Sequence, residues 1–247
     1  MKLNLFIFSF LISTGLFAQT TRKTVEDPLT GIKEKYNVLK ADEQIKQGKY
    51  AAYRIFHNQL ICEGYYQHNF KDSLWTYYNM RGEKIESGYY KNGKKVGIWE
   101  GLRYNLEPSV KYDFTVRKLL FYKPEQAETG KTFLVFNGKD TSTLQLEQGP
   151  IYLEGSGRFL VAISTSLRYP AKARENNTQG KVIIAFKIDE NGTVSNYRIK
   201  KGIGDGCDEE ALRCVKLIEG DWLPGQLNGK AVAVEYNLPL NFTLSDK

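Results

Sequence analysis

The sequence predicts a mostly β protein whose C-terminal part combines strands with helices. Three observations carry this prediction. The 247 residues include 16 Tyr, 13 Phe and 3 Trp, side chains that are enriched in strands. Two glycine- and aromatic-rich segments recur at a fixed offset in the first half of the chain. Near the C-terminus, every second residue from Val232 to Leu244 is apolar, which is the period of a strand with one buried face.

The first residues have the layout of a secretory signal peptide, which we assign to 1–18. Lys2 is followed by an apolar run that ends at Phe17 and by the small residue Ala18, after which we expect cleavage. The alternative is an uncleaved inner-membrane anchor, but the run is shorter than the about 20 mainly apolar residues that a membrane span needs. The sequence therefore predicts an exported protein.

The charge and the cysteines of the chain bear on its possible partners and disulfides. The formal charge of +7 is scattered among acidic residues, so a solvated basic face is the simplest interpretation and attraction to anionic surfaces is the alternative. We expect no nucleic-acid partner for an exported chain. If Cys207 and Cys214 share a helix, their separation is about 10 Å, beyond the reach of a disulfide unless Cys207 lies before the helix on a bent turn. Together with Cys62 the chain has three cysteines, which is an odd number, and no disulfide framework is predicted.

The repeat lies in the first half of the chain. "GYYQHNFKDSLW" begins at Gly64, and "GYYKNGKKVGIW" begins 24 residues later at Gly88. The Gly-Tyr-Tyr start, a lysine (Lys71 and Lys95) and the final Trp recur in step. Each unit is expected to form a hairpin of an aromatic strand, a polar turn and a strand that carries the Trp.

These segments resemble MORN-type repeats, chiefly over Tyr53 to Gly101, and we assign 19–149 to a MORN-like β-repeat region. The resemblance implies that the glycines and tyrosines build a stack of hairpins. A scaffold is one interpretation of such a stack. A ligand- or partner-binding face made by exposed tyrosines is the other.

The last third of the chain predicts an α-β-β-α-β order. A short helix begins at Tyr169-Pro170, and an alternating strand starts at Lys181. Asn191-Gly192 has the chemistry of a hairpin turn, and the returning strand breaks alternation in a way that indicates a bulge. A helix follows in "CDEEALRCVKLIEG", with Asp208 as its expected N-cap. The long alternating strand completes the order.

This part, assigned to 150–247, resembles the C-terminal domain of TonB-type proteins. The motifs that carry the resemblance are "YPAKAR", "DENGTVSN", "GIGDGCDEEALR", the Trp-x-Pro-Gly from Trp222, and "NLPLNF". A lead-in helix over about Arg158 to Leu167 agrees with the same family. The combination of motifs is more specific than any one of them.

The resemblance implies a periplasmic or cell-envelope protein that binds the TonB box of outer-membrane transporters as an added strand. Pro239 interrupts the final strand, and proline in a strand indicates a sheet edge, which this mode of binding requires. The alternative is a closing edge that a loop or a homodimer partner covers. The partner-binding residues that the resemblance implies are Tyr169, Pro170, Val232, Val234, Tyr236 and Leu238.

The sequence also differs in two features from what the resemblance implies for an energy-transducing TonB protein. Repeats replace the expected Pro-rich spacer, and the hydrophobic segment that would engage an inner-membrane proton-driven motor complex looks cleavable. Coupling to energy-dependent transport is therefore one predicted function. The alternative is a non-transducing envelope adaptor or scaffold that binds proteins through both parts.

Enzymatic chemistry is not predicted. His57 and His68, with Cys62 between them, do not have a standard zinc spacing, and the C-terminal cysteines have no histidine in their own region to act as a base. We expect no catalytic residue, no metal site and no cofactor.

Overall fold

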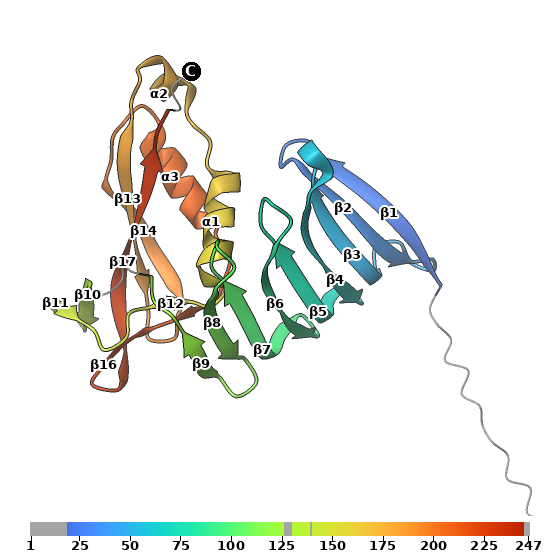
Figure 1. The fold of residues 1–247 in the computed structure, drawn as a ribbon, viewed down its shortest axis with the longest axis horizontal. Coiled ribbons are helices and arrows are strands. Elements are labelled where there is room, and N and C mark those ends of the chain that lie inside the picture. Colours follow the sequence, from blue (N-terminus) through green and yellow to red (C-terminus); the bar gives the residue numbers. More distant parts are fainter. Residues whose placement is uncertain (1–18, 126–129, 139, 245–247) are drawn as a thin grey trace, which may run out of the picture.

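The computed structural model describes residues 19–125, 130–138 and 140–244, so the predicted signal peptide lies outside the described residues. Among the described residues, two large sheets and a separate pair of short strands make up the fold, which is drawn in Figure 1. The first is a nine-stranded antiparallel meander in which each strand pairs with the next, from β1 to β9. The second carries the helices and contains the C-terminal strand.

The strands of the first sheet extend well beyond the two units that the sequence shows. They are β1 (Thr20–Asp27), β2 (Ile32–Leu39), β3 (Lys46–Arg54), β4 (Leu60–Gln67), β5 (Phe70–Tyr78), β6 (Lys84–Lys91), β7 (Lys94–Leu102), β8 (Pro108–Asp113) and β9 (Lys118–Tyr122), with a 3₁₀ turn at Phe56–Asn58. The "NG" of the second unit, Asn92 and Gly93, has φ of 50° and 78° and joins β6 to β7 through a two-residue turn.

Glycine and tryptophan make the repeating contact of this sheet. The Trp75 ring lies on Gly64 of the neighbouring strand, and the Trp99 ring lies on Gly88 in the same way, so a Cβ at either glycine would overlap the indole. Each indole nitrogen donates a 3.1 Å hydrogen bond, Trp75 to the carbonyl of Tyr65 and Trp99 to that of Tyr89. Both tryptophans are 1% exposed. The predicted hairpin stack is therefore compatible with the structure.

The second sheet has the order β11-β10-β17-β13-β14, with β16 also paired to β17. Its strands are β10 (Thr132–Asn137), β11 (Asp140–Gln145), β13 (Gly180–Ile188), β14 (Val194–Lys201), β16 (Gly225–Leu227) and β17 (Lys230–Phe242), and β12 (Ile151–Tyr152) pairs separately with β15 (Trp222–Leu223). The helices are α1 (Gly155–Ser166), α2 (Ala171–Glu175) and α3 (Cys207–Lys216).

The predicted helix-strand-strand-helix-strand order appears as α2, β13, β14, α3 and β17, preceded by the lead-in helix α1. The bulge is present as two register shifts between β13 and β14. The N-cap prediction is wrong, because Gly206 occupies that position with φ 85°. Asp208 lies inside α3 and accepts hydrogen bonds from Ile203 and Gly204, which fixes the loop before the helix.

Two further predictions about arrangement differ from the structure. The hairpin β10–β11, which falls within the region 19–149, belongs to the second sheet. The final strand β17 is not an edge over its whole length, because β10 pairs with Ala233–Glu235 while β13 pairs with Val234–Phe242. Hydrophobic periodicity reports which face of a strand is buried, whereas strand order depends on contacts that are distant in the chain.

The core of the second sheet lies between its inner face and helix α3. Ile184, Val234 and Leu240 pack there with Ala211 and Val215 of the helix. Cys62, Cys207 and Cys214 are buried free thiols. Within the described ranges, no helix is both long and apolar enough to cross a membrane.

Candidate functional site

An open cavity of about 890 Å³ lies where the end of the repeat sheet faces the C-terminal sheet. One wall is formed by strands β13 and β17 and contributes Lys181, Ile183, Tyr236, Asn237, Leu238 and Pro239. The facing wall comes from the last repeat strands and their turns, with Arg103, Tyr104, Asn105, Ser109, Tyr122 and Lys123. Tyr152, Ser156, Phe159 and Leu160, before and within α1, are also part of the lining.

This cavity coincides with the part of β17 that has a free side. From Asn237 to Phe242, β17 pairs with β13 on one side, and no described strand pairs with it on the other. Unpaired backbone N–H and C=O groups along a strand are a template for another strand. The free side therefore begins beyond Glu235, the last residue of β17 that pairs with β10.

Pro239 lies in the middle of this free stretch, opposite Ile183 of β13. Proline donates no N–H, so the ladder with β13 loses no hydrogen bond if Pro239 faces the free side. Backbone groups of alternate residues point the same way in an antiparallel ladder. By this argument the N–H groups of Asn237 and Asn241 also point outward, on either side of the proline.

The side chain of Asn237 supplies a second sign of an incomplete site. Its Oδ1 is buried and has no hydrogen-bond partner among the described residues. A buried carbonyl oxygen without a donor costs about 1–3 kcal/mol relative to a satisfied one. A donor on a bound segment would therefore be stabilised at this position.

The structure brings some of the sequence-predicted residues to the cavity and separates others from it. Tyr236 and Leu238 line it. Val232 pairs with Gly225 of β16, and Val234 is fully buried between β10 and β13. The predicted stretch of β17 therefore overlaps the free side only at its C-terminal end.

Tyr169 and Pro170 lie at the other end of the free side. The Tyr169 ring packs edge-to-face on Phe242, with ring centroids 5.6 Å apart. Its hydroxyl donates a 2.7 Å hydrogen bond to the carbonyl of Thr178. Pro170 is the N-cap of α2 and packs near Gly206.

Sequence reasoning missed the other lining residues. Lys181 and Ile183 could have been found from the pairing of β13 with β17, since they lie opposite Asn241 and Pro239. Arg103 had no local signal. Its guanidinium donates to the carbonyls of Lys123 and Pro124 at 2.9 and 2.7 Å, which fixes the facing wall.

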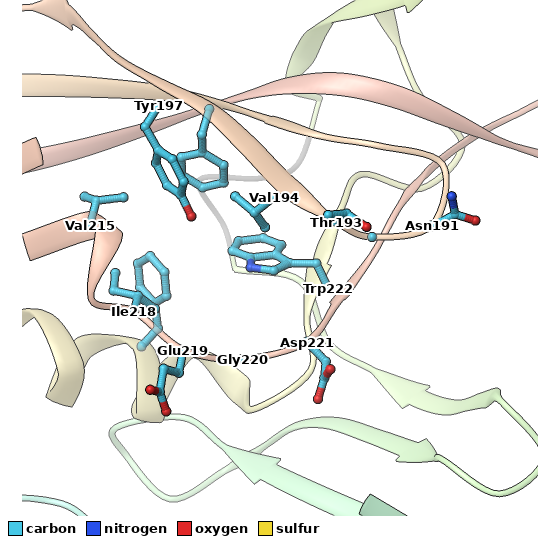
Figure 2. A pocket seen from close by; sticks show the side chains of 13 residues that line it. Asn191, Thr193, Val194, Tyr197, Val215, Ile218, Glu219, Gly220, Asp221 and Trp222 are labelled. Atoms are coloured by element: carbon cyan, nitrogen blue, oxygen red, sulfur yellow. The ribbon is translucent and has the colours of Figure 1, made fainter. Parts of the chain in front are cut away.

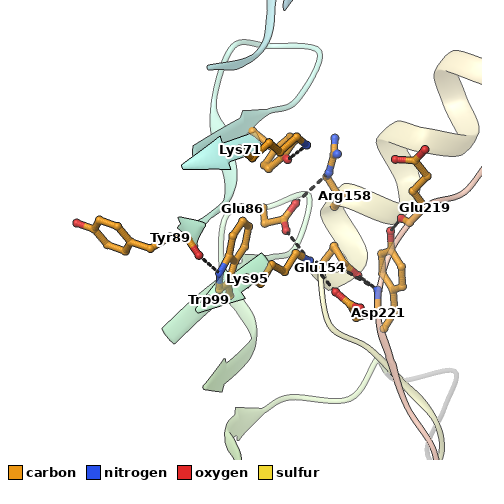
Figure 3. A network of polar contacts seen from close by, with 11 residues as sticks. Lys71, Glu86, Tyr89, Lys95, Trp99, Glu154, Arg158, Glu219 and Asp221 are labelled. Atoms are coloured by element: carbon orange, nitrogen blue, oxygen red, sulfur yellow. Dashed lines mark hydrogen bonds and ion pairs between the residues drawn. The ribbon is translucent and has the colours of Figure 1, made fainter. Parts of the chain in front are cut away.

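A buried ionic network joins the repeat sheet to the C-terminal part, as Figure 3 shows. Lys95 of β7 forms an ion pair with Glu154, which precedes α1, and lies 3.0 Å from the Asp221 carboxylate. Both carboxylate oxygens of Glu154 accept the Asp221 N–H at 3.0 Å. Arg158 of α1 reaches Glu86 of β6 at 3.0 Å. The network joins β6 and β7 to α1 and to the loop before β15.

Burial changes the ionisation of this network. It raises the pKa of Glu154 to about 7 against the opposing effect of Lys95, and it raises the pKa of Glu86. Burial alone would lower the pKa of Lys95, but the carboxylates of Glu154, Glu86 and Asp221 raise it overall. Lys95 therefore stays protonated at neutral pH, whereas the raised pKa of Glu154 lies near neutrality.

A second cavity of about 510 Å³ lies between the β13–β14 turn and the end of α3. Figure 2 shows Trp222 within it below Val194, with the side chains of Glu219 and Asp221 pointing away from Tyr197. Phe186 and Tyr236 also pack against Trp222, at 5.8 and 5.1 Å between ring centroids. This cavity is an extension of the aromatic core.

Within residues 19–125, 130–138 and 140–244, no cluster of three His, Cys, Asp or Glu side chains could hold a metal ion. His57 and His68 have φ of 73° and 48° and lie in turns of the repeat sheet.

Comparison with known proteins finds a family match in the C-terminal part. Residues 165–244 match the family model described as Gram-negative bacterial TonB protein C-terminal. The match supports a TonB-type C-terminal domain, a place in the cell envelope, and interaction with outer-membrane transporters in general. It includes Tyr169, Pro170 and all of β17, and it covers none of the repeat strands.

The other comparisons add little. No curated protein matches this chain. Among solved structures, a mutant of S. aureus TarM in complex with Fondaparinux, alpha-GlcNAc-glycerol and UDP is 13% identical, with a TM-score of 0.24. The match covers 40% of this chain and 20% of that one.

Proposed function

We propose that this protein is a non-enzymatic, TonB-like envelope protein that binds the TonB box of outer-membrane transporters by strand addition to the free side of β17. The observation that carries the proposal is the stretch from Asn237 to Phe242, which pairs with β13 on one side and with no described strand on the other, and whose residues Asn237–Pro239 line an open cavity. Backbone hydrogen bonds would supply affinity, and side-chain pockets would supply selectivity. The proposed role is coupling to energy-dependent transport.

The binding stretch is narrower than sequence similarity alone implies. In this proposal the incoming strand contacts Tyr236 and Leu238 at one end and reaches the Tyr169–Phe242 contact at the other. In this proposal Val232 and Val234 do not receive the partner, because β16 already pairs with Val232 and β10 already pairs with Val234. Asn237 supplies an outward N–H and the unsatisfied side-chain oxygen.

The experiment uses the full chain labelled with ¹⁵N and titrated with TonB-box peptides from transporters of the same cell. The expected result is saturable shifts of backbone amides within Tyr236–Phe242 and at Tyr169. An isolated C-terminal fragment is unsuitable, because β10 and the repeat sheet both contact this part. Protected amides at Asn237 and Asn241 without any peptide-induced shift would contradict the proposal, and a dimer in light scattering would then indicate pairing between copies.

Two substitutions at Asn237 separate backbone pairing from side-chain recognition. Asn237→Pro removes the outward N–H in a strand that already accepts Pro239, whereas Asn237→Ala keeps that N–H and removes only the side-chain amide. If strand addition carries the affinity, the proline variant binds peptide about tenfold or more weakly than the alanine variant. Equal losses in both variants would instead place the affinity in the side chain.

The second candidate function is a non-transducing adaptor. The MORN-like repeats support it, because they form one wall of the cavity and are fixed to α1 by the Lys95–Glu154 network. A mature N-terminus at Gln19 and peptide binding that is independent of an inner-membrane motor complex would favour this candidate. An intact N-terminus in the membrane fraction and transport that needs the motor would favour transduction.

A further inference from the structure

A ladder of lysines crosses one face of the repeat sheet. Lys46, Lys71 and Lys95 belong to β3, β5 and β7, which alternate with β4 and β6 in the sheet order. Adjacent strands are about 4.8 Å apart, so successive lysines of this ladder are about 10 Å apart.

Each lysine of the ladder lies on the aromatic ring of the residue four positions later. The ammonium of Lys71 is 4.4 Å from the Trp75 ring centroid, and that of Lys95 is 4.7 Å from the Trp99 centroid. Lys46 is 5.3 Å from the Tyr50 centroid. Each ammonium also contacts a second aromatic ring, which comes from the next hairpin. The second ring is Tyr66 for Lys46, Tyr90 for Lys71 and Phe114 for Lys95.

The three positions differ in the carboxylate that they hold. At Lys95 the C-terminal part inserts Glu154, which pairs with the ammonium above the Trp99 ring. Lys46 lies 3.6 Å from Glu34. Lys71 has no carboxylate within ion-pair distance among the described residues, and its ammonium contacts the Tyr77 hydroxyl at 3.1 Å.

The charge around Lys71 is therefore unbalanced. Arg158 packs on the Tyr77 ring at 3.9 Å and pairs with Glu86, which also lies 3.8 Å from Lys95, so this buried carboxylate is already shared by two other cations. Burial lowers the pKa of Lys71, in contrast to Lys95, where the carboxylates overcome the same effect. Lys71 therefore lies between two aromatic rings as Lys95 does, but it has no paired carboxylate equivalent to Glu154.

We propose that this face binds an acidic, extended segment of a partner protein, one of whose carboxylates takes at Lys71 the place that Glu154 takes at Lys95. The segment crosses the strands from Lys71 toward Lys46. In the extended polyproline II conformation three residues rise about 9 Å and complete one turn, so carboxylates at every third position point the same way and match the spacing of the ladder. Desolvated charge pairs of this kind contribute to both specificity and affinity. The proposal is independent of strand addition at β17.

The test titrates the ¹⁵N-labelled full chain with a hexaglutamate peptide, with hexaglutamine as the uncharged control. The expected result is saturable movement of the Trp75 indole N–H by hexaglutamate alone, weakened by added salt. The Trp99 indole, whose lysine is already paired with Glu154, should move less. Absence of saturable movement at Trp75 would overturn the proposal.

Two lysine substitutions test the site. Lys71→Met keeps the length of the side chain and removes the charge, and we expect it to weaken peptide binding by about tenfold. Lys94→Met is the matched control, since Lys94 is exposed and its side chain points to the opposite face of β7 from Lys95. Equal losses in both variants would indicate only general attraction to a basic protein. Binding of anionic phospholipid vesicles at Trp75 without peptide binding would replace the protein partner with a membrane surface.

Discussion

The backbones of Gly101 and Gly155 touch where the repeat sheet meets the C-terminal part. A Cβ built on Gly155 would lie 2.8 Å from the carbonyl carbon of Gly101, and a Cβ on Gly101 would lie 2.5 Å from the carbonyl oxygen of Glu154. At the offset of 24 residues, Gly101 follows Tyr53 and Tyr77. Gly101 thus occupies a position that is tyrosine in the two earlier units, and it lies where the backbone of Glu154 and Gly155 packs against the repeat sheet.

The first prediction concerns this contact. We expect Gly101→Ala to destabilise the protein by about 1–3 kcal/mol, because the new methyl group meets backbone that cannot rotate away. Gly225→Ala is the control, since its Cβ would meet mainly the Leu146 side-chain tip, 2.6 Å away. Urea unfolding measures both. A smaller loss at Gly101 than at Gly225 would show that the junction adjusts easily.

The second prediction concerns the glycine–tryptophan contact of the repeats. Gly64→Ala and Gly88→Ala should each cost about 2–4 kcal/mol, since the added methyl group overlaps a tryptophan that is almost fully buried. Gly82→Ala should cost only about 1 kcal/mol, from its φ of 78°, because no atom lies within 4 Å of its Cβ. Near-ultraviolet circular dichroism of the tryptophans during thermal unfolding compares the three. Equal losses would mean that backbone strain, not packing, sets the cost.

The third prediction concerns pH and Glu154. The pKa of Glu154 rises from 4.5 to about 7 on folding, so the folded state holds this proton more tightly than the unfolded state. Its contribution to stability is full below pH 4.5 and is lost as pH rises to about 7, a change on the order of 1–3 kcal/mol. Glu154→Gln removes this slope, although it also weakens the pairing with Lys95. Parallel stability-pH curves for the two proteins would contradict the assignment.

The fourth prediction has the opposite sign. Burial raises the pKa of Glu235, but hydrogen bonds from Lys200 and Arg198, at 2.7 and 2.6 Å, lower it overall. The stabilisation by this carboxylate is therefore present above its unfolded pKa of 4.5 and is lost as pH falls through the lowered value. We expect Glu235→Gln to destabilise the protein at pH 7 and to have less effect at pH 3. Chemical denaturation at both pH values measures the difference, and a larger effect at the lower pH would reverse the sign.

Much of the local structure follows from the sequence. The period of 24 residues in Gly64–Trp75 and Gly88–Trp99 predicts hairpins, and the structure adds that each glycine makes room for the next tryptophan. The alternation of Val232 to Leu244 predicts a strand with one buried face, and β17 shows it from Leu238 to Phe242, whereas Ala233, Val234 and Glu235 are all buried. The helix α3 was predicted to reach Gly220 but ends at Lys216, since Leu217 caps it.

The tertiary structure decided which edge is free and what faces it. Nothing local to β17 shows that β10 covers Ala233–Glu235, because β10 lies about a hundred residues earlier in the chain. Nor does the repeat pattern show that Glu154 fills the position above Lys95 and leaves Lys71 without a carboxylate. Periodicity is a property of neighbouring residues, so the sequence determined the elements and their buried faces. Strand order, the free side of β17 and the pairing of buried charges depend on segments that only folding brings together.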